Sequence, residues 1–338
     1  MCTSPLKGFP YGKTKNGKDN FVITSYKCDH IEVNRNDVPI KIYEPTFIHS
    51  QDTKEIIRDF IEIPCGHCLE CRLDYSRQWA NRCMLEAQSY KHNYFVTLTY
   101  DDLHLPMNEY VDVDGVLQLS PTLVKRDLQL FMKRLRKKFG DNIRFYACGE
   151  YGSKTHRPHY HLILFNFNPN DLIFLKQNFQ GDLYYTSPGL ESCWKYGYSM
   201  IAEVNWNTCA YVARYIVKKQ FGENADYKKF NYEPEFTLMS RKPGIARDWY
   251  ENHKDNLYDY DAIYIKDGIP VKPSKYFDRL YDIDYSAQME EIKKVRLESM
   301  LHHKMLIAEM TSQTYEEQLS TRNNVIEEKT KKLKRKEI

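Results

Sequence analysis

Two strand-like segments joined by a short loop constrain the fold of this chain more than any other feature. Residues 143–150 and 159–165 are rich in apolar and aromatic side chains, and both read as β-strands. The eight residues between them include Gly152 and Pro158, which favour turns. If the two strands pair as a hairpin, Glu150 lies roughly opposite His159.

The remaining segments indicate a domain of mixed strands and helices. Ser120 and Pro121 suit the start of a helix that Gly140 ends, and apolar residues recur between them at helical spacing. Further strands are expected at 94–100 and 199–204, and further helices at 74–90 and 207–219. Because strands and helices do not alternate regularly, the pattern predicts an α+β domain with a largely antiparallel sheet.

Composition divides the 338 residues into three parts. Residues 1–90 hold a polar segment with a cysteine cluster and a helix, 91–250 carry the strand and helix pattern, and 251–338 are helical and charged with a basic tail. Hydrophobic residues make up 42% of the chain, which is enough for a core. We expect neither a membrane span nor a secretion signal, since the sequence shows no run of 18 apolar residues and no basic and apolar leader.

Nine cysteines are unevenly spaced, which fits a reducing cytoplasm better than a disulfide scaffold. Cys65, Cys68 and Cys71 have the spacing of metal ligands, and a fourth ligand would complete a structural zinc site. The candidates for that ligand are Cys2, Cys28 and Cys83. The alternative is that the three thiols are small buried side chains at a turn before the helix.

The net charge is only +3, so the distribution of charge says more about nucleic-acid binding than its total. In the predicted helix before Gly140, seven cations accompany a single anion, Asp127. A solvated surface and a phosphate-binding surface both fit this face. The cations are Lys125, Arg126, Lys133, Arg134, Arg136, Lys137 and Lys138. The chain also has 27 tyrosines, on whose rings the bases of single-stranded nucleic acid can stack.

His159 and His161 stand two residues apart on a predicted strand, so their imidazoles project from the same face. Two neutral nitrogen ligands side by side can hold a divalent cation. Glu150 is within reach across the short loop as a third ligand, and His156 is a rival that we expect in the loop itself. The alternative is a His-x-His pair that starts a strand by chance.

Tyr211, Tyr215 and Lys218 stand at i, i+4 and i+7 and therefore share one face of the predicted helix. A phenol beside a cation is a candidate nucleophile for a phosphodiester, and its attack would give a phosphotyrosine and a free 3′ hydroxyl. A metal would polarise the phosphate, and Lys218 would stabilise its charge. Tyrosines at this spacing also pack in cores, so this interpretation depends on the histidine strand.

Three segments resemble the motifs of HUH endonucleases that start rolling-circle replication: FVTLTYDD at 95–102, HYHLILF at 159–165 and YVARYIVK at 211–218. The paired tyrosines resemble the two-tyrosine subclass. Longer segments resemble the replication initiation proteins of gokushoviruses, small single-stranded DNA phages of the microvirus group. These segments are PCGHCLECRLDYSRQWANRCMLE, FMKRLRKKFGDNIRFYACGEYGSKTHRPHYH and EPEFTLMSRKPGIARDWY, within about residues 60–250.

The resemblance implies an HUH endonuclease-like, antiparallel five-stranded sheet flanked by helices. It implies that the protein nicks single-stranded origin DNA, becomes covalently linked to the 5′ end, and rejoins the strand through the second tyrosine. Its partners would be single-stranded and origin DNA and host helicase and polymerase, in the cytoplasm of the bacterial host cell. The resemblance assigns Mg²⁺ or Mn²⁺ to His159, His161 and Glu150, the nucleophiles to Tyr211 and Tyr215, and assistance to Lys218.

Three other interpretations compete with this one. A non-catalytic protein that binds single-stranded nucleic acid would need no divalent metal and would leave the DNA intact. A metal-dependent hydrolase would use water as its nucleophile and form no covalent adduct. A zinc-stabilised scaffold without chemistry would give the histidine strand no purpose.

Overall fold

The computed structural model has the α+β class that the sequence predicts, with antiparallel pairing in each of its sheets. Two compact units are present: residues 1–74 with 303–338, and residues 75–302. The division of the chain at residues 90 and 250 stays a prediction. No helix of the described part combines the length and apolar character that a membrane span needs. The structure describes residues 2–15, 17, 19–45, 49–152, 155–214, 226–265 and 268–332.

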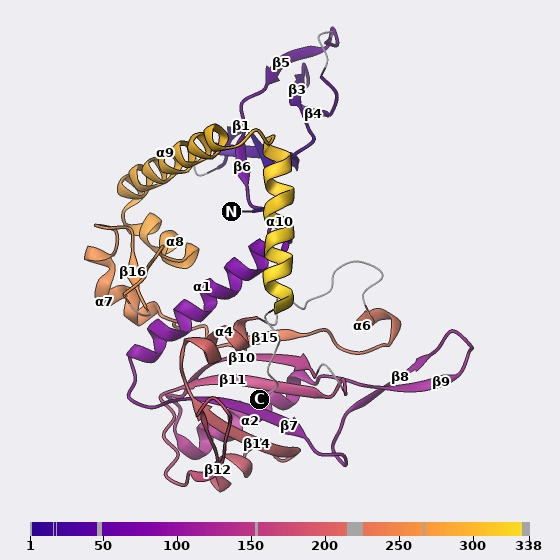
Figure 1. Ribbon diagram of the computed structural model, residues 1–338, viewed down its shortest axis with the longest axis vertical. Coiled ribbons are helices and arrows are strands. Elements are labelled where there is room, and N and C mark those ends of the chain that lie inside the picture. Colours follow the sequence, from indigo (N-terminus) through magenta and orange to yellow (C-terminus); the bar gives the residue numbers. More distant parts are fainter. Residues whose placement is uncertain are drawn as a thin grey trace. The chain divides into compact units, whose positions relative to one another are not determined.

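The second unit is built on a seven-stranded antiparallel sheet with the strand order β12-β13-β14-β7-β11-β10-β15 (Figure 1). Its four predicted strands are confirmed with slightly shifted ends. The implied number of five strands is wrong, because the hairpin of β12 and β13 extends the sheet beyond β14. The strands are β7 Asn93–Tyr100, β10 Arg144–Tyr151, β11 Pro158–Phe165, β12 Ile173–Gln177, β13 Leu183–Thr186, β14 Gly197–Glu203 and β15 Phe236–Met239.

Nine helices lie in the described residues. The helix expected from residue 74 begins earlier, at Leu69, because the carbonyl oxygen of Cys68 accepts a hydrogen bond from the Arg72 N–H at 3.1 Å. The helical C-terminal extension is confirmed by the two longest stretches after residue 285. The helices are α1 Leu69–Gln88, α2 Lys125–Phe139, α3 Pro188–Glu191, α4 Trp206–Ala213, α6 Asp226–Lys229, α7 Arg247–Leu257, α8 Lys275–Asp284, α9 Ser286–Met310 and α10 Tyr315–Lys332.

The start of α2 differs from the prediction. Ser120 and Pro121 belong to a strand instead of capping the helix, which begins only at Lys125. The N–H groups of Leu123 and Val124 donate to the hydroxyl groups of one tyrosine in β10 and one in β11, each at 2.9 Å. Buried phenols from the sheet therefore satisfy backbone donors before the helix, where a serine cap was expected.

Four small sheets complete the fold, two of them three-stranded and two of them two-stranded. In the first unit, Phe9, Cys28, Ile31 and Val33 form a small buried apolar core. The strands of that unit are β1 Leu6–Lys13, β2 Asp19–Ser25, β3 His30–Asn34, β4 Pro39–Ile42, β5 Thr53–Ile57 and β6 Ile61–Ile63, in the orders β2-β1-β6 and β4-β3-β5. The two-stranded sheets pair β8 Met107–Val111 with β9 Leu117–Pro121, and β16 Ile263–Tyr264 with β17 Pro270–Val271.

Strand alternation gives the seven-stranded sheet two different apolar faces. On one face, Leu98 and Leu162 contribute to a core that α2 completes. On the other face, Ile163 and Phe165 pack with residues of α1 and α4. Helices therefore flank the sheet on both sides (Figure 1), and His161 points toward the face that α4 covers because it alternates with Leu162.

Candidate functional site

The hairpin of β10 and β11 has the register that the sequence suggests. Glu150 lies directly opposite His159, and Cys148 lies opposite His161. The side chains of Glu150 and His161 are buried, with residue exposures of 6% and 5%, whereas His159 is half-buried. The three predicted ligands therefore come from adjacent positions on one face of one hairpin.

Two threonines of β7, which the sequence analysis missed, contact the two imidazoles. Thr97 Oγ1 lies 3.0 Å from His161 Nδ1, and Thr99 Oγ1 lies 3.0 Å from His159 Nδ1. Each threonine stands opposite its histidine in the β7–β11 register. An Nδ1–H that donates to the threonine leaves the Nε2 lone pair for a metal ion. The signal was present in the sequence, because threonines two residues apart in FVTLTY match histidines two residues apart in HYH.

Tyr211 reaches the same site from α4. Its hydroxyl group donates a hydrogen bond to Glu150 Oε1 at 2.9 Å, and the same carboxylate oxygen lies 3.2 Å from His161 Nε2. The Tyr211 ring packs edge-on against the rings of His161 and Phe95, with centroid distances of 4.9 Å and 6.1 Å. A predicted nucleophile and two predicted metal ligands are therefore in direct contact.

The sequence of α4 explains why it lies so close to the sheet. Asn205 and Thr208 form a capping box, in which the Asn205 side chain accepts from the Thr208 N–H and the Thr208 hydroxyl accepts from the Asn205 N–H. Most of the buried side chains of α4 are small, and the helix packs on β10 and β11. The buried residues are Cys209, Ala210, Val212 and Ala213. This close approach places Tyr211 beside Glu150.

Two predicted catalytic residues, Tyr215 and Lys218, lie outside the described residues, so their places stay predictions. The rival ligand His156 is in the loop, as expected, with a backbone φ of 54°. Its ring stacks on Tyr151 at a centroid distance of 4.8 Å. Because Tyr151 belongs to the core on the α2 face, His156 lies away from His161.

Among the residues that the structure describes, two groups of potential metal ligands bring their ligand atoms within 4.8 Å of one another. One group is Cys2, Cys65, Cys68 and Cys71, and the other is His30, Glu32 and His49. Glu150, His159 and His161 do not form such a group as their side chains stand, since the centroids of the two imidazole rings are 6.2 Å apart. Side-chain rotation would be needed for all three to bind one cation.

The cysteine cluster selects Cys2 from the three candidates for a fourth ligand. Cys2 Sγ lies 3.5 Å from Cys65 Sγ and 3.7 Å from Cys68 Sγ. The other two candidates are buried in separate apolar cores, Cys28 beside Phe9 and Cys83 beneath the seven-stranded sheet. All nine cysteines are free thiols, in agreement with the expectation that the chain is no disulfide scaffold.

Hydrogen bonding tunes the thiols of this cluster in different directions. Burial alone would raise the pKa of Cys68, but hydrogen bonds from Thr3 and Cys71 outweigh it and lower the pKa to about 6. Burial raises the pKa of Cys2 and of Cys71. One thiol of the cluster is therefore ionised near neutral pH, which is the form in which sulfur binds metals.

The predicted basic helix divides into exposed and structural cations. Arg134 Nε donates to the carbonyl oxygen of Cys193 at 2.7 Å, and Arg136 Nε donates to that of Ile143 at 3.0 Å. These two guanidinium groups therefore have structural roles. The exposed members are Lys125, Arg126, Lys133, Lys137 and Lys138.

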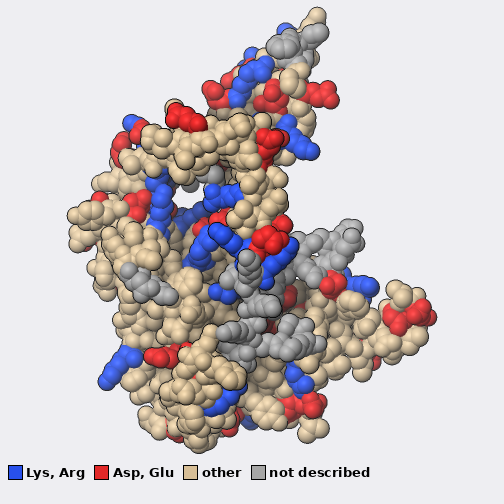
Figure 2. Space-filling model, viewed as in Figure 1, with Lys and Arg blue, Asp and Glu red and all other residues tan. Residues whose placement is uncertain are grey.

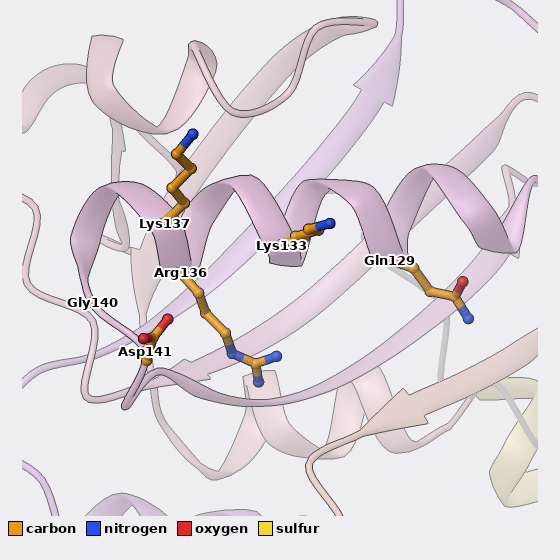
Figure 3. Close-up of a pocket in the computed structure, with 6 residues that line it drawn as sticks. All are labelled: Gln129, Lys133, Arg136, Lys137, Gly140 and Asp141. Atoms are coloured by element: carbon orange, nitrogen blue, oxygen red, sulfur yellow. The ribbon is translucent and has the colours of Figure 1, made fainter.

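Part of this basic surface is hollowed. Figure 3 shows Lys133, Arg136 and Lys137 projecting from α2, around a cavity of about 610 Å³ that Gly140 also lines. Elsewhere, basic and acidic side chains are interspersed on the face shown in Figure 2, as a net charge of +3 would suggest. Because α2 covers one face of the sheet and α4 the other, the lysines lie on the side away from Tyr211.

Comparison with known proteins gives consistent matches. The family described by the replication-associated protein ORF2 matches residues 93–220, which include β7, β10, β11 and α4. Replication-associated protein ORF2 of Spiroplasma virus 4 is 32% identical over 286 residues, which cover 80% of this chain and 86% of that protein. Replication-associated protein VP4 of Bdellovibrio phage phiMH2K is 32% identical over 246 residues, covering 70% and 73%. No solved structure matches the chain.

Proposed function

The chain belongs to the family of phage replication-associated proteins, and from this premise we propose that it initiates rolling-circle replication by nicking single-stranded origin DNA. A tyrosine would become linked to the 5′ end of the cut strand, and a second tyrosine would later rejoin it. The observation that carries this proposal is the hydrogen bond from Tyr211 to Glu150, beside His161.

The chemistry of the proposed cut needs a nucleophile and an acceptor for its proton. Attack by the Tyr211 oxygen forms a bond to phosphorus and breaks the bond between phosphorus and the 3′ oxygen. The phenol loses a proton, for which the Glu150 carboxylate is an acceptor at 2.9 Å, and the departing 3′ oxygen gains one. The products are a 5′-phosphotyrosine and a 3′ hydroxyl, and the reverse reaction rejoins the strand.

Glu150, His159 and His161 have the donor atoms that a divalent cation requires. The contacts of Thr97 and Thr99 at Nδ1 support this assignment, since they orient each Nε2 toward the face that carries Glu150. Mg²⁺ or Mn²⁺ bound there would act as a Lewis acid on the scissile phosphate. The two histidines and the carboxylate leave coordination positions open for a phosphate oxygen.

Tyr215 and Lys218 complete the proposed machinery. Tyr215 is the second nucleophile, which attacks the regenerated origin while Tyr211 holds the displaced 5′ end, or the two exchange these roles. Lys218 stabilises charge on the phosphate. In this cycle the protein acts with host helicase and polymerase in the cytoplasm of the bacterial host cell.

Incubation with a single-stranded oligonucleotide from the phage origin tests the proposal. A label on the 3′ end of the oligonucleotide follows the fragment that would remain attached to tyrosine. We expect a denaturant-resistant adduct with Mg²⁺ or Mn²⁺ and none with EDTA, and peptide mapping should find the phosphotyrosine. If DNA binds equally well in EDTA and stays intact, the chain is a nucleic-acid-binding protein without this chemistry.

The threonines of β7 give a prediction about metal affinity. Thr97→Val keeps the shape of the side chain but removes its contact with His161 Nδ1. The Mn²⁺ concentration for half-maximal adduct formation should rise about 10- to 100-fold, the usual cost of losing such a supporting hydrogen bond. Ser199→Ala is the control, because the Ser199 hydroxyl is buried in the neighbouring strand without a hydrogen-bond partner in the described part of the chain. Equal metal requirements in both variants would contradict the role of Thr97.

The exposed lysines of α2 give a prediction about binding. Replacing Lys133 and Lys137 with glutamine should weaken binding of long single strands and reduce the slope of log K against log salt by about 1.4, if each contacts one phosphate. Cleavage of a short, saturating oligonucleotide should not change, since these lysines lie on the other side of the sheet from Tyr211. The matched control replaces the exposed Lys272 and Lys275 instead. Identical salt slopes would make α2 a solvated surface.

The cysteine cluster is proposed to hold a structural zinc ion. Sulfur ligands at the usual Zn–S distance of about 2.3 Å are roughly 3.8 Å apart in a tetrahedron. The distances of 3.5 Å and 3.7 Å from Cys2 to Cys65 and Cys68 fit this spacing. Zinc bound there would join the chain before β1 to the start of α1, because Cys71 lies in the first turn of that helix.

A further inference from the structure

A second group of metal-ligating side chains lies on β3 and in the segment before β5. His30 and Glu32 alternate on β3 with Ile31 and Val33, which enter the apolar core of the first unit. The two polar side chains therefore share the opposite side of the strand. His49 approaches them from the chain between β4 and β5.

One carboxylate oxygen lies between the two imidazoles. Glu32 Oε1 is 2.6 Å from His49 Nδ1 and 3.4 Å from His30 Nε2. The rings of His30 and His49 are nearly perpendicular, with an interplanar angle of 82° and centroids 5.7 Å apart. We propose that His30, Glu32 and His49 bind a second zinc ion, separate from the cysteine cluster and from the proposed catalytic residues.

The surrounding side chains support the ligands in the way that metal sites require. The other ring nitrogen of His30, Nδ1, lies 2.7 Å from Asp29 Oδ2, as in carboxylate–histidine–zinc triads. Thr53 Oγ1 donates to the second oxygen of Glu32 at 2.7 Å. Hydrogen bonds from Thr53 and His49 hold the pKa of Glu32 at about 2, so the carboxylate is ionised at neutral pH.

Burial and charge favour a cation at this place. The side chain of His30 is fully buried, and that of Glu32 is only 7% exposed. Asp29 and Glu32 bring two negative charges, and Arg58, at 3.3 Å from Asp29, offsets one of them. A divalent ion would offset the remaining charge in a place where water is largely excluded.

The donor set selects the kind of metal. Two imidazole nitrogens favour zinc over magnesium or calcium, which prefer oxygen ligands. Two histidines and one glutamate leave a fourth position for water. The need for such an ion follows from the small apolar core of this unit, whose fully buried members are Phe9, Cys28, Ile31 and Val33.

Zinc content of the purified full chain tests the proposal. After growth with zinc and dialysis, the wild-type chain should retain one zinc ion more than His49→Gln and Glu32→Gln, as measured by mass spectrometry of the metal. A Cys65→Ser/Cys68→Ser variant should keep the zinc of the histidine site. Cobalt bound in that variant should show no thiolate charge-transfer band. The readout therefore does not depend on cleavage activity or on the cysteine cluster.

Matched variants separate metal binding from folding. His253→Gln, which replaces a histidine of the second unit, should retain as much zinc as the wild-type chain. Asp29→Asn should weaken zinc binding at the histidine site about 10- to 100-fold without abolishing it. Because the His49 side chain is 26% exposed, its variant is the one expected to fold, which circular dichroism checks. A folded His49→Gln chain with the wild-type zinc content would overturn the proposal.

Discussion

A chain in which Tyr211 and Tyr215 are both phenylalanine is expected to form no detectable covalent adduct with origin DNA. Each single variant should retain some cleavage, because the other hydroxyl group can still attack. Loss of both should lower adduct formation by more than about a thousandfold, since removal of a covalent nucleophile acts on that scale or above. The measurement is a denaturing gel with an oligonucleotide labelled at its 3′ end.

Two controls sharpen this test. Tyr198→Phe replaces a tyrosine of the same sheet whose side chain is 70% exposed, and it should leave adduct formation unchanged. Binding of DNA by the double variant, measured in EDTA, should match the wild-type chain, because no binding group is removed. Attachment of the double variant to DNA would refute the assignment of the tyrosines.

Removal of the proposed zinc ion from the cysteine cluster is expected to unfold much of the first unit. Structural zinc sites contribute roughly 10–16 kcal/mol of apparent binding energy, which is comparable with the whole stability of a typical domain. Cys65→Ser/Cys68→Ser should therefore lose zinc and expose β1 and β2 to hydrogen exchange. Metal analysis and exchange followed by mass spectrometry measure the two effects.

Another buried thiol provides the comparison. Cys193 lies in the core of the seven-stranded sheet, so Cys193→Ser should keep the zinc of the cysteine cluster and the normal exchange of β1. Protein prepared under reducing conditions that contains no zinc at the cluster would contradict the proposal. So would a double serine variant whose first unit exchanges as slowly as that of the wild-type chain.

Local sequence patterns were sufficient for the central hairpin. A short loop between two strand-like segments fixed the pairing, and period-two alternation put His159 and His161 on one face. The helix that carries Tyr211 was also predictable, because Val212 is an apolar residue at the right spacing and is buried as expected. These inferences succeeded because each one depends on residues that are close together in the chain.

Features that depend on distant contacts were not predictable. The cysteine ligand at position 2 is 63 residues from Cys65, and the sequence offered two other candidates. The predicted cap at Ser120 failed because hydroxyl groups from the sheet satisfy the backbone there, a tertiary solution that no local signal reveals. The grouping of His49 with β3 likewise depends on how the segment before β5 folds back.

The pairing of β7 with β11 makes chemical competence depend on strand alignment. A slip of one residue would turn Thr97 and Thr99 to the opposite face and leave both imidazoles without these contacts. A copy of the protein with a misaligned sheet would thus be inert toward DNA, even if it stayed compact and bound the strand. Strand alignment in the centre of the sheet is a built-in check that only correctly folded molecules can break a genome.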